Sequence, residues 1–149
     1  MRAVVQRVTR ARVTVGDEEV LRMDEGLLAF VGVGRRDTSA SAEELARRIL
    51  YLRIFADAEQ RMNLSLLETG GTLGVVSEFT LFGDARQGRR PFFGDAMPAG
   101  QAAPLVEAVA EAARTLGATV VCGRFVARMD VELVNAGPVT LLLDTDRQF

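Results

Sequence analysis

This chain of 149 residues contains no histidine and no lysine, so all 18 of its basic residues are arginine. Without histidine, neither a Ser-His-Asp triad nor a Cys-His pair can form, and a zinc site that uses histidine is excluded. Without lysine, Schiff-base catalysis and the lysine of a phosphate-binding loop are excluded too. Any catalysis must therefore use hydroxyl, carboxylate, arginine or backbone groups.

Cysteine is almost absent as well. Cys122 is the only one, which rules out an intrachain disulfide and a thiolate metal site. It lies in an apolar run, residues 118–122, that is typical of a strand. We therefore expect Cys122 to be a small, buried core residue.

Long hydrophobic stretches are missing. No run approaches the roughly 18 apolar residues of a membrane helix, and residues 1–7 lack the apolar stretch and cleavage site of a signal peptide. A cytoplasmic protein without a membrane partner is the expectation. The net charge of −2 and the pI near 5.3 differ from the basic balance of proteins that grip long nucleic acids. We expect no DNA partner, and at most a local patch that contacts a small part of an RNA.

The pattern of apolar residues predicts a single α+β domain over residues 1–149 with a mostly antiparallel sheet. Strands outnumber helices and do not alternate regularly with them, which favours this class over a doubly wound sheet. The expected strands are residues 10–15, 18–23, 27–33, 72–81 (as one strand or two), 119–122, 130–134 and 139–144.

Two main helices are expected. Ser41 and Glu44 fit a capping box at the start of the first helix, with Ser39 as a competing N-cap. The second helix is expected to start near Gln101, with Pro104 in its first turn and Gly117 after its end. The expected apolar faces are Leu45, Ile49 and Leu52 on the first helix, and Leu105, Val109, Ala112 and Leu116 on the second. A loop over residues 83–100 and a frayed tail over residues 145–149 complete the prediction.

Two short segments at the ends of apolar runs are the best candidates for chemistry: Ser77-Glu78-Phe79-Thr80-Leu81 and Asn135-Ala136-Gly137-Pro138-Val139-Thr140. Taken alone, the first fits strand-end hydroxyls that bond to local backbone. The second, taken alone, fits a hairpin loop, because Asn, Gly and Pro are turn residues.

Together, the two segments resemble the motifs of the D-aminoacyl-tRNA deacylase family, whose usual forms are Ser-Gln-Phe-Thr-Leu and Asn-X-Gly-Pro-Val-Thr. Further blocks of the chain are similar in the same order, namely residues 4–11, 52–55, 62–65, 89–93 and 123–125. The resemblance implies a barrel-like deacylase fold and a homodimer that needs no metal and no cofactor. It also implies hydrolysis of the ester of D-aminoacyl-tRNA at the acceptor end and of glycyl-tRNA mischarged on tRNA(Ala), with rejection of L-aminoacyl esters in translational proofreading.

In that family the Gly-Pro bond is cis, and its loop reaches into the active site of the partner subunit. By resemblance, this role passes to Gly137 and Pro138, together with Ala136. Glycine lets a ligand approach the backbone closely. Carbonyl groups of the loop would accept hydrogen bonds from the substrate's α-ammonium group, while a rigid wall occupies the space that an L side chain needs.

The resemblance also assigns roles around the first motif. The Phe79 amide would stabilise the oxyanion, helped by the Ser77 or Thr80 region. Glu78 stands where the family has Gln, which adds a charge and removes amide donors. Further candidates are Phe125 to stack on the terminal adenine or to fill the core, Arg7 to organise the pocket, and Arg86, Arg89 and Arg90 to contact phosphates or to lie in a solvated loop.

Two other functions stay open. One is a module that binds an RNA end without catalysis. The other is an esterase that uses Glu78 as a general base through a water molecule. In an ideal strand Glu78 points to the opposite face from Ser77 and Phe79, which disfavours direct Ser-Glu chemistry.

Overall fold

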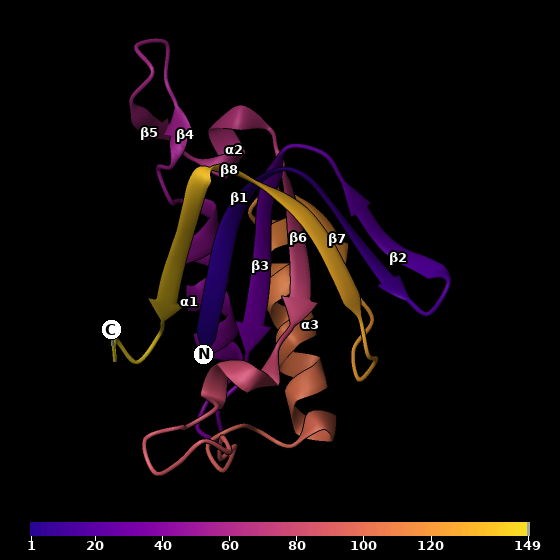
Figure 1. Cartoon of the computed structure of the whole chain (residues 1–149). Coiled ribbons are helices and arrows are strands. Elements are labelled where there is room, and N and C mark those ends of the chain that lie inside the picture. Colours follow the sequence, from indigo (N-terminus) through magenta and orange to yellow (C-terminus); the bar gives the residue numbers. More distant parts are fainter. Residues whose placement is uncertain (149) are drawn as a thin grey trace.

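The structure is a computed structural model that describes residues 1–148. Its central strand is the first one, β1 (Arg2–Val15). Along one edge it pairs with β8 (Asp130–Asp144). Along the other edge it pairs first with β3 (Gly26–Gly32) and then with β2 (Glu18–Met23). All three pairings are antiparallel, so the expected antiparallel start of the sheet is confirmed (Figure 1).

The sheet continues with two parallel pairings that the sequence did not predict. β3 pairs with β6 (Thr72–Ser77), and β6 pairs with β7 (Thr119–Cys122). Parallel neighbours need long crossover connections. Here α1 (Ser39–Leu50) lies in the connection between β3 and β6, and α3 (Ala99–Thr115) lies in that between β6 and β7.

The curved sheet is a nearly closed barrel, which confirms the expected α+β class. The gap between its end strands is bridged by an ion pair in which Arg124, just after β7, holds both carboxylate oxygens of Glu18 on β2 at 2.9 and 2.7 Å. Three small elements lie outside the barrel: β4 (Phe55–Ala56), β5 (Met62–Leu64) and the short helix α2 (Leu66–Thr69). Among the described residues, no helix is long and apolar enough to cross a membrane.

Two apolar clusters hold the fold together. Both large helices pack on one face of the sheet, where Leu45, Ile49 and Val109 are completely buried. A second cluster fills the concave inside of the barrel, and its buried members are Val8, Ala11, Val13, Leu21, Met23, Leu28 and Val76. Along β1, the first buried side chains, Ala3 and Val5, belong to the first cluster, and the later ones, Val8, Ala11 and Val13, belong to the second.

The start of α1 differs from the prediction. The N-cap is Thr38, and Ser41 is the third residue of the helix, with its hydroxyl accepting a hydrogen bond from the Thr38 amide at 3.2 Å. Ser and Thr both suit either place in such a box, so the sequence alone did not select the pair. Leu45 and Ile49 are buried as expected, whereas Leu52 lies beyond the helix and is half-buried.

α3 begins at Ala99, earlier than predicted, so Pro104 lies inside the helix rather than in its first turn. The helix therefore loses one backbone hydrogen bond, because proline has no N–H. Gly117 follows the helix with a positive φ of 98°, as expected for a stop. The buried face is Ala102, Val109, Ala110 and Ala113, whereas Leu105 and Ala112 are half-buried and Leu116 is exposed.

Three further expectations were wrong. Residues 135–138 are not a hairpin loop, because β8 runs through them as one strand. The strand predicted over residues 72–81 stops at Ser77. Cys122 is half-buried, because it lies on the edge strand β7, and burial raises the pKa of its thiol.

In the tail, the Thr145 amide donates to the Met1 carbonyl at 2.9 Å, and residue 149 is outside the described range.

Two glycine substitutions test the packing, because they should change the free energy of unfolding in opposite directions. A Cβ at Gly26 would lie 1.9 Å from the Thr72 carbonyl oxygen, whereas at Gly100, inside α3, it would meet nothing. Gly26→Ala should lower the free energy of unfolding by about 1–3 kcal/mol or more. Gly100→Ala should raise it by about 0.5–1 kcal/mol. Urea unfolding measures both, and equal effects would contradict the packing described.

Candidate active site

The first motif forms a sharp turn at the end of β6. The Glu78 amide donates to the Val31 carbonyl of β3 at 2.8 Å, and the chain then enters the 3-10 helix η1 (Phe79–Phe82). The amides of Phe79 and Thr80, at the start of this helix, donate to no acceptor among the described residues. The first N–H groups of a helix have no partner within it, so two free donors are available at this place.

Glycines let η1 lie directly against β3. A Cβ at Gly32 would come within 3.0 Å of the Glu78 carbonyl oxygen, and one at Gly34 would lie 2.7 Å from the Phe82 ring. On the outer side, the Phe79 ring meets the Phe93 ring edge to face, with 5.2 Å between the ring centres. The backbone of η1 is therefore packed between β3 and the 83–100 loop.

A cleft of about 590 Å³ opens beside η1, between the end of the sheet and α3. Ser77, Glu78 and Phe79 line one side of it, and Phe125 lines the other. Phe125 is half-buried and also packs against the main core. The remaining lining residues, mostly apolar side chains of α3 and of the 126–131 segment, are ones that sequence reasoning did not find, because no motif marks them.

The polar side chains at the start of η1 are arranged differently from those of an ideal strand. The Thr80 hydroxyl donates a hydrogen bond to the Glu78 carboxylate. The two side chains meet because the chain coils into η1 after Ser77, instead of continuing as a strand as the sequence predicted. No cluster of metal-ligating side chains occurs in residues 1–148.

The second motif is a bulge within β8. The register pairs Gln6 with Thr140 and Val8 with Asn135, so the residues in between on β8 loop out opposite Arg7. The Gly137–Pro138 peptide bond is cis, Gly137 has a φ of 127°, and both residues are exposed. The bulge therefore presents backbone, rather than side chains, to the outside.

Side-chain hydrogen bonds fix the bulge. The Asn135 side chain accepts from the Val139 amide at 2.9 Å and donates to the Thr140 hydroxyl at 2.8 Å. The Arg7 guanidinium donates to the carbonyls of Ala136, at 3.1 Å, and of Ile54. Arg7 thus organises the Gly-Pro bulge, and not the cleft beside η1.

Within one chain, the two motifs do not meet. Ser77 pairs with Val31, which pairs with Ala3, whereas the bulge faces Arg7 on the far side of β1. The offset is about 13 Å along the strands and about 14 Å across them, at ~3.3 Å per residue and ~4.8 Å per strand. In Figure 1, η1 follows the lower end of β6, and the bend of β8 lies at the upper end of the sheet.

The arginines of the 83–100 loop differ in their surroundings. The Arg86 side chain forms two hydrogen bonds to Asp84, at 2.9 and 2.7 Å, and lowers the pKa of Asp84 to about 2. Arg89 and Arg90 are exposed and form no ion pair within residues 1–148. These two are therefore the members of the predicted RNA-binding set whose charge is available.

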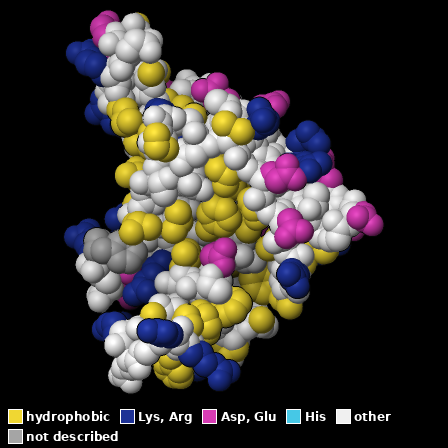
Figure 2. Space-filling model, in the orientation of Figure 1, with side chains coloured by type: hydrophobic (Ala, Val, Ile, Leu, Met, Phe, Trp, Pro, Cys, Tyr) yellow, Lys and Arg dark blue, Asp and Glu magenta, His cyan; other side chains and the backbone are white. Residues whose placement is uncertain are grey.

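The face of the sheet opposite the helices carries an exposed apolar row. Register places Leu142, Val4 and Phe30 side by side on β8, β1 and β3. Leu142 is 59% exposed, and Val4 and Phe30 are half-buried. Figure 2 shows hydrophobic side chains gathered in the middle of this face.

Comparison with known proteins gives one consistent result. The family model described as D-Tyr-tRNA(Tyr) deacylase matches residues 4–144. The D-aminoacyl-tRNA deacylase of Roseiflexus sp. (strain RS-1) is 57% identical over 145 residues, which are 97% of this chain and 94% of that protein. The D-aminoacyl-tRNA deacylase of Symbiobacterium thermophilum is 50% identical over 149 residues, covering 100% of this chain and 99% of that protein.

Two solved structures share the fold. One, titled c-Myc DNA Unwinding Element Binding Protein, superposes with a TM-score of 0.92 at 36% identity and covers 97% of this chain and 99% of its own. The other, titled as a probable eukaryotic D-amino acid tRNA deacylase, has a TM-score of 0.80 at 18% identity, with coverages of 95% and 97%. At that identity the second likeness concerns the fold alone.

The role of Arg7 can be tested through stability. Arg7→Met removes charged hydrogen bonds to two carbonyl groups and should lower the free energy of unfolding by about 1.5–3 kcal/mol. Arg22→Met is the matched control, because Arg22 makes only an exposed ion pair with Glu19, which is worth about 0–1 kcal/mol. Denaturant unfolding compares the two variants, and equal losses would contradict the assignment.

Proposed function

The chain belongs to the D-Tyr-tRNA(Tyr) deacylase family, and we propose that it hydrolyses the ester of D-aminoacyl-tRNA and of glycyl-tRNA while it spares L-aminoacyl esters. The products are free tRNA and the free amino acid. The observation that carries the proposal is the pair of unpartnered backbone amides at the start of η1, at the mouth of a cleft that contains no histidine.

The proposed chemistry uses the backbone. The ester carbonyl lies with its oxygen toward the Phe79 amide, and the Ser77 or Thr80 region adds a second donor. Water attacks the carbonyl carbon, and the oxyanion is stabilised by these donors. The bond to the ribose oxygen then breaks, and this oxygen leaves with the proton that the attacking water gives up. One well-placed donor of this kind is worth roughly 2.7–4 kcal/mol. An aminoacyl ester is already activated, so no side-chain nucleophile is needed.

Chirality is selected at the Gly-Pro bulge. Backbone carbonyls near Gly137 accept hydrogen bonds from the substrate's α-ammonium group. These bonds fix the directions in which the other substituents of the substrate's Cα point. With the ammonium and the ester both held, an L side chain would collide with the wall at Pro138, whereas a D side chain points away. Glycine has no side chain to reject. Discrimination then rests on a clash with the wrong isomer.

A homodimer completes this site. The bulge and the η1 cleft are too far apart in one chain to hold one substrate. A two-fold dimer that packs the Leu142 face against itself, with its axis across the strands, reverses the strand direction of one copy, so the bulge of each chain comes toward the cleft of the other. The outer edge of β8 forms no ladder within the described chain, which leaves further polar groups for the interface.

The tRNA end is held beside the cleft. The terminal adenine stacks on Phe125, which is worth about 1–3 kcal/mol for a base on an aromatic ring. Arg89 and Arg90 contact phosphates of the acceptor strand, and Arg86 does so only in competition with Asp84. The modest number of free arginines suits a substrate that is gripped only at its end.

The central prediction is a chiral preference. With matched D- and L-tyrosyl-tRNA and glycyl-tRNA, the protein should remove the D and glycyl esters and leave the L ester at its rate in buffer. Ester loss is followed by acid gel electrophoresis of the tRNA. Equal loss of the D and L esters would refute the role of the bulge. Binding of tRNA without loss of any ester would support the non-catalytic RNA-binding module.

The dimer is tested by charging the apolar row. Leu142→Glu should give monomers in size-exclusion chromatography and remove most of the deacylase activity. It should keep a cooperative unfolding transition, because Leu142 is exposed within the chain. Leu116→Glu, at the exposed end of α3, is the control and should stay dimeric and active. Active monomers of the Leu142 variant would disprove the shared site.

A second candidate function follows from the Glu78–Thr80 hydrogen bond, which fits a general base held for water activation. Glu78→Gln separates the two. In the backbone mechanism the variant keeps or gains activity, because glutamine is the family residue. If Glu78 were the base, activity would fall by about 10²–10⁴. Thr80→Val controls for loss of the hydrogen bond alone.

A further inference from the structure

We propose that Arg2 is a positioning residue for the active-site turn η1. It contacts the side of η1 away from the cleft, so that the Phe79 amide stays directed into the cleft. The proposal rests on the proposed function. Arg2 does not line the cleft beside η1 but a separate cavity of about 860 Å³ on the other side of the turn. It therefore acts through η1 and does not touch the substrate.

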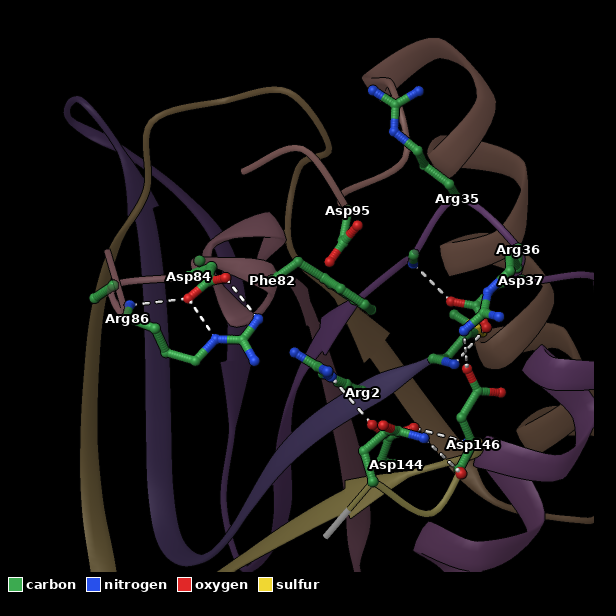
Figure 3. A pocket seen from close by; sticks show the side chains of 15 residues that line it. Arg2, Arg35, Arg36, Asp37, Phe82, Asp84, Arg86, Asp95, Asp144 and Asp146 are labelled. Atoms are coloured by element: carbon green, nitrogen blue, oxygen red, sulfur yellow. Dashed lines mark hydrogen bonds and ion pairs between the residues drawn. The ribbon is translucent and has the colours of Figure 1, made fainter. Parts of the chain in front are cut away.

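Three contacts make Arg2 a clamp. Its Nη1 donates to the Leu81 carbonyl at 3.1 Å, and its guanidinium lies 4.5 Å from the centre of the Phe82 ring. Its Nε donates to Asp144 Oδ2, also at 3.1 Å. Figure 3 shows Arg2 between Phe82 and Asp144. The planar guanidinium suits this combination, because it can stack on a ring and donate along two directions in its plane.

The anchor of the clamp is rigid. Asp144 ends β8, and its side chain is only 3% exposed. Its other carboxylate oxygen accepts from the Asp146 amide at 2.7 Å, and its carbonyl accepts from Arg48 at 2.6 Å. A buried carboxylate with fixed partners holds the guanidinium in one place, and the guanidinium in turn fixes Leu81 and Phe82.

The turn needs such support because it holds itself weakly. The hydrogen bonds at its two ends are Leu81 amide to Glu78 carbonyl, at 3.3 Å, and Gly83 amide to Thr80 carbonyl, at 2.9 Å. Short 3-10 helices have poor hydrogen-bond geometry. On the cleft side, the Phe79 and Thr80 amides have no acceptor within the described chain, so the aim of these donors depends on packing from behind.

The matched control lies on the same strand. Arg12 faces Glu132 directly across β1 and β8, as Arg2 faces Asp144, and both arginines form ion pairs with the residue opposite. Arg12 does not contact η1. Arg2→Met and Arg12→Met therefore each remove one charge and one cross-strand ion pair, which is exposed at Glu132 and buried at Asp144, and only the first removes the clamp.

The experiment reads both catalysis and the turn itself. For Arg2→Met we expect kcat for D-tyrosyl-tRNA to fall about 10–100-fold, with KM changed less than about threefold. In the same variant, the amides of Leu81 and Gly83, whose hydrogen bonds close the turn, should exchange with solvent at least tenfold faster in NMR. Arg12→Met should change neither. Arg2→Lys, which keeps the charge but not the planar fork, should recover only part of kcat.

The outcomes are distinguishable. If the wild-type protein does not hydrolyse the ester, the proposed function fails, and amide exchange still decides whether Arg2 holds the turn. Unchanged exchange in Arg2→Met overturns the clamp, and so does a rise in KM without a fall in kcat. If Arg2→Met does not fold, Arg2→Lys carries the test, and wild-type exchange and kcat in that variant would overturn the proposal.

Discussion

The rest of the structure depends on one constraint, the pairing of β1 with both β8 and β3. Because these ladders share one long strand, the Gly137–Pro138 bulge is tied to the level of Arg7, and the turn after Ser77 is tied to the level of Ala3. The core keeps both registers in place, since a slip by one residue would turn every buried side chain outward. The separation of the two motifs is thus built into the sheet.

Backbone groups replace side chains at both motifs. At η1 the Phe79 and Thr80 amides have no acceptor within residues 1–148, and Phe79 lines the cleft. At the bulge, Gly137 and Pro138 are exposed without a polar side chain. Two arginines support this backbone: Arg7 donates a hydrogen bond to the Ala136 carbonyl, and Arg2 donates one to the Leu81 carbonyl. A chain without histidine or lysine can support ester hydrolysis in this way, because preorganised amides act without any proton transfer of their own.

Local patterns in the sequence predicted much of the fold. β2, β7 and the cores of both helices follow from periodicity and from stop signals such as Gly117. The sequence did not reveal that β8 continues through Gly137, because turn residues also suit a bulge, and the pairing that decides between them lies on β1. The parallel place of β6 depends on the pairing of residues such as Gly26 and Thr72, and the role of Arg2 depends on its contact with Leu81. These partners are far apart in the sequence, so no local pattern encodes them. The motif at Ser77–Leu81 was found through family resemblance, and its coiling into η1 was not.

Mixing two inactive variants tests the shared site most directly. Ser77→Tyr fills the cleft, and Pro138→Ala alters the bulge, so each homodimer should be inactive. After unfolding and joint refolding of equal amounts, half of the dimers contain both chains, and each of these has one intact site. A site shared between two chains predicts recovery of about a quarter of wild-type deacylase activity, because pairing in a two-fold dimer is random. No recovery, although mixed dimers are detected by mass spectrometry, would contradict a site built from two chains.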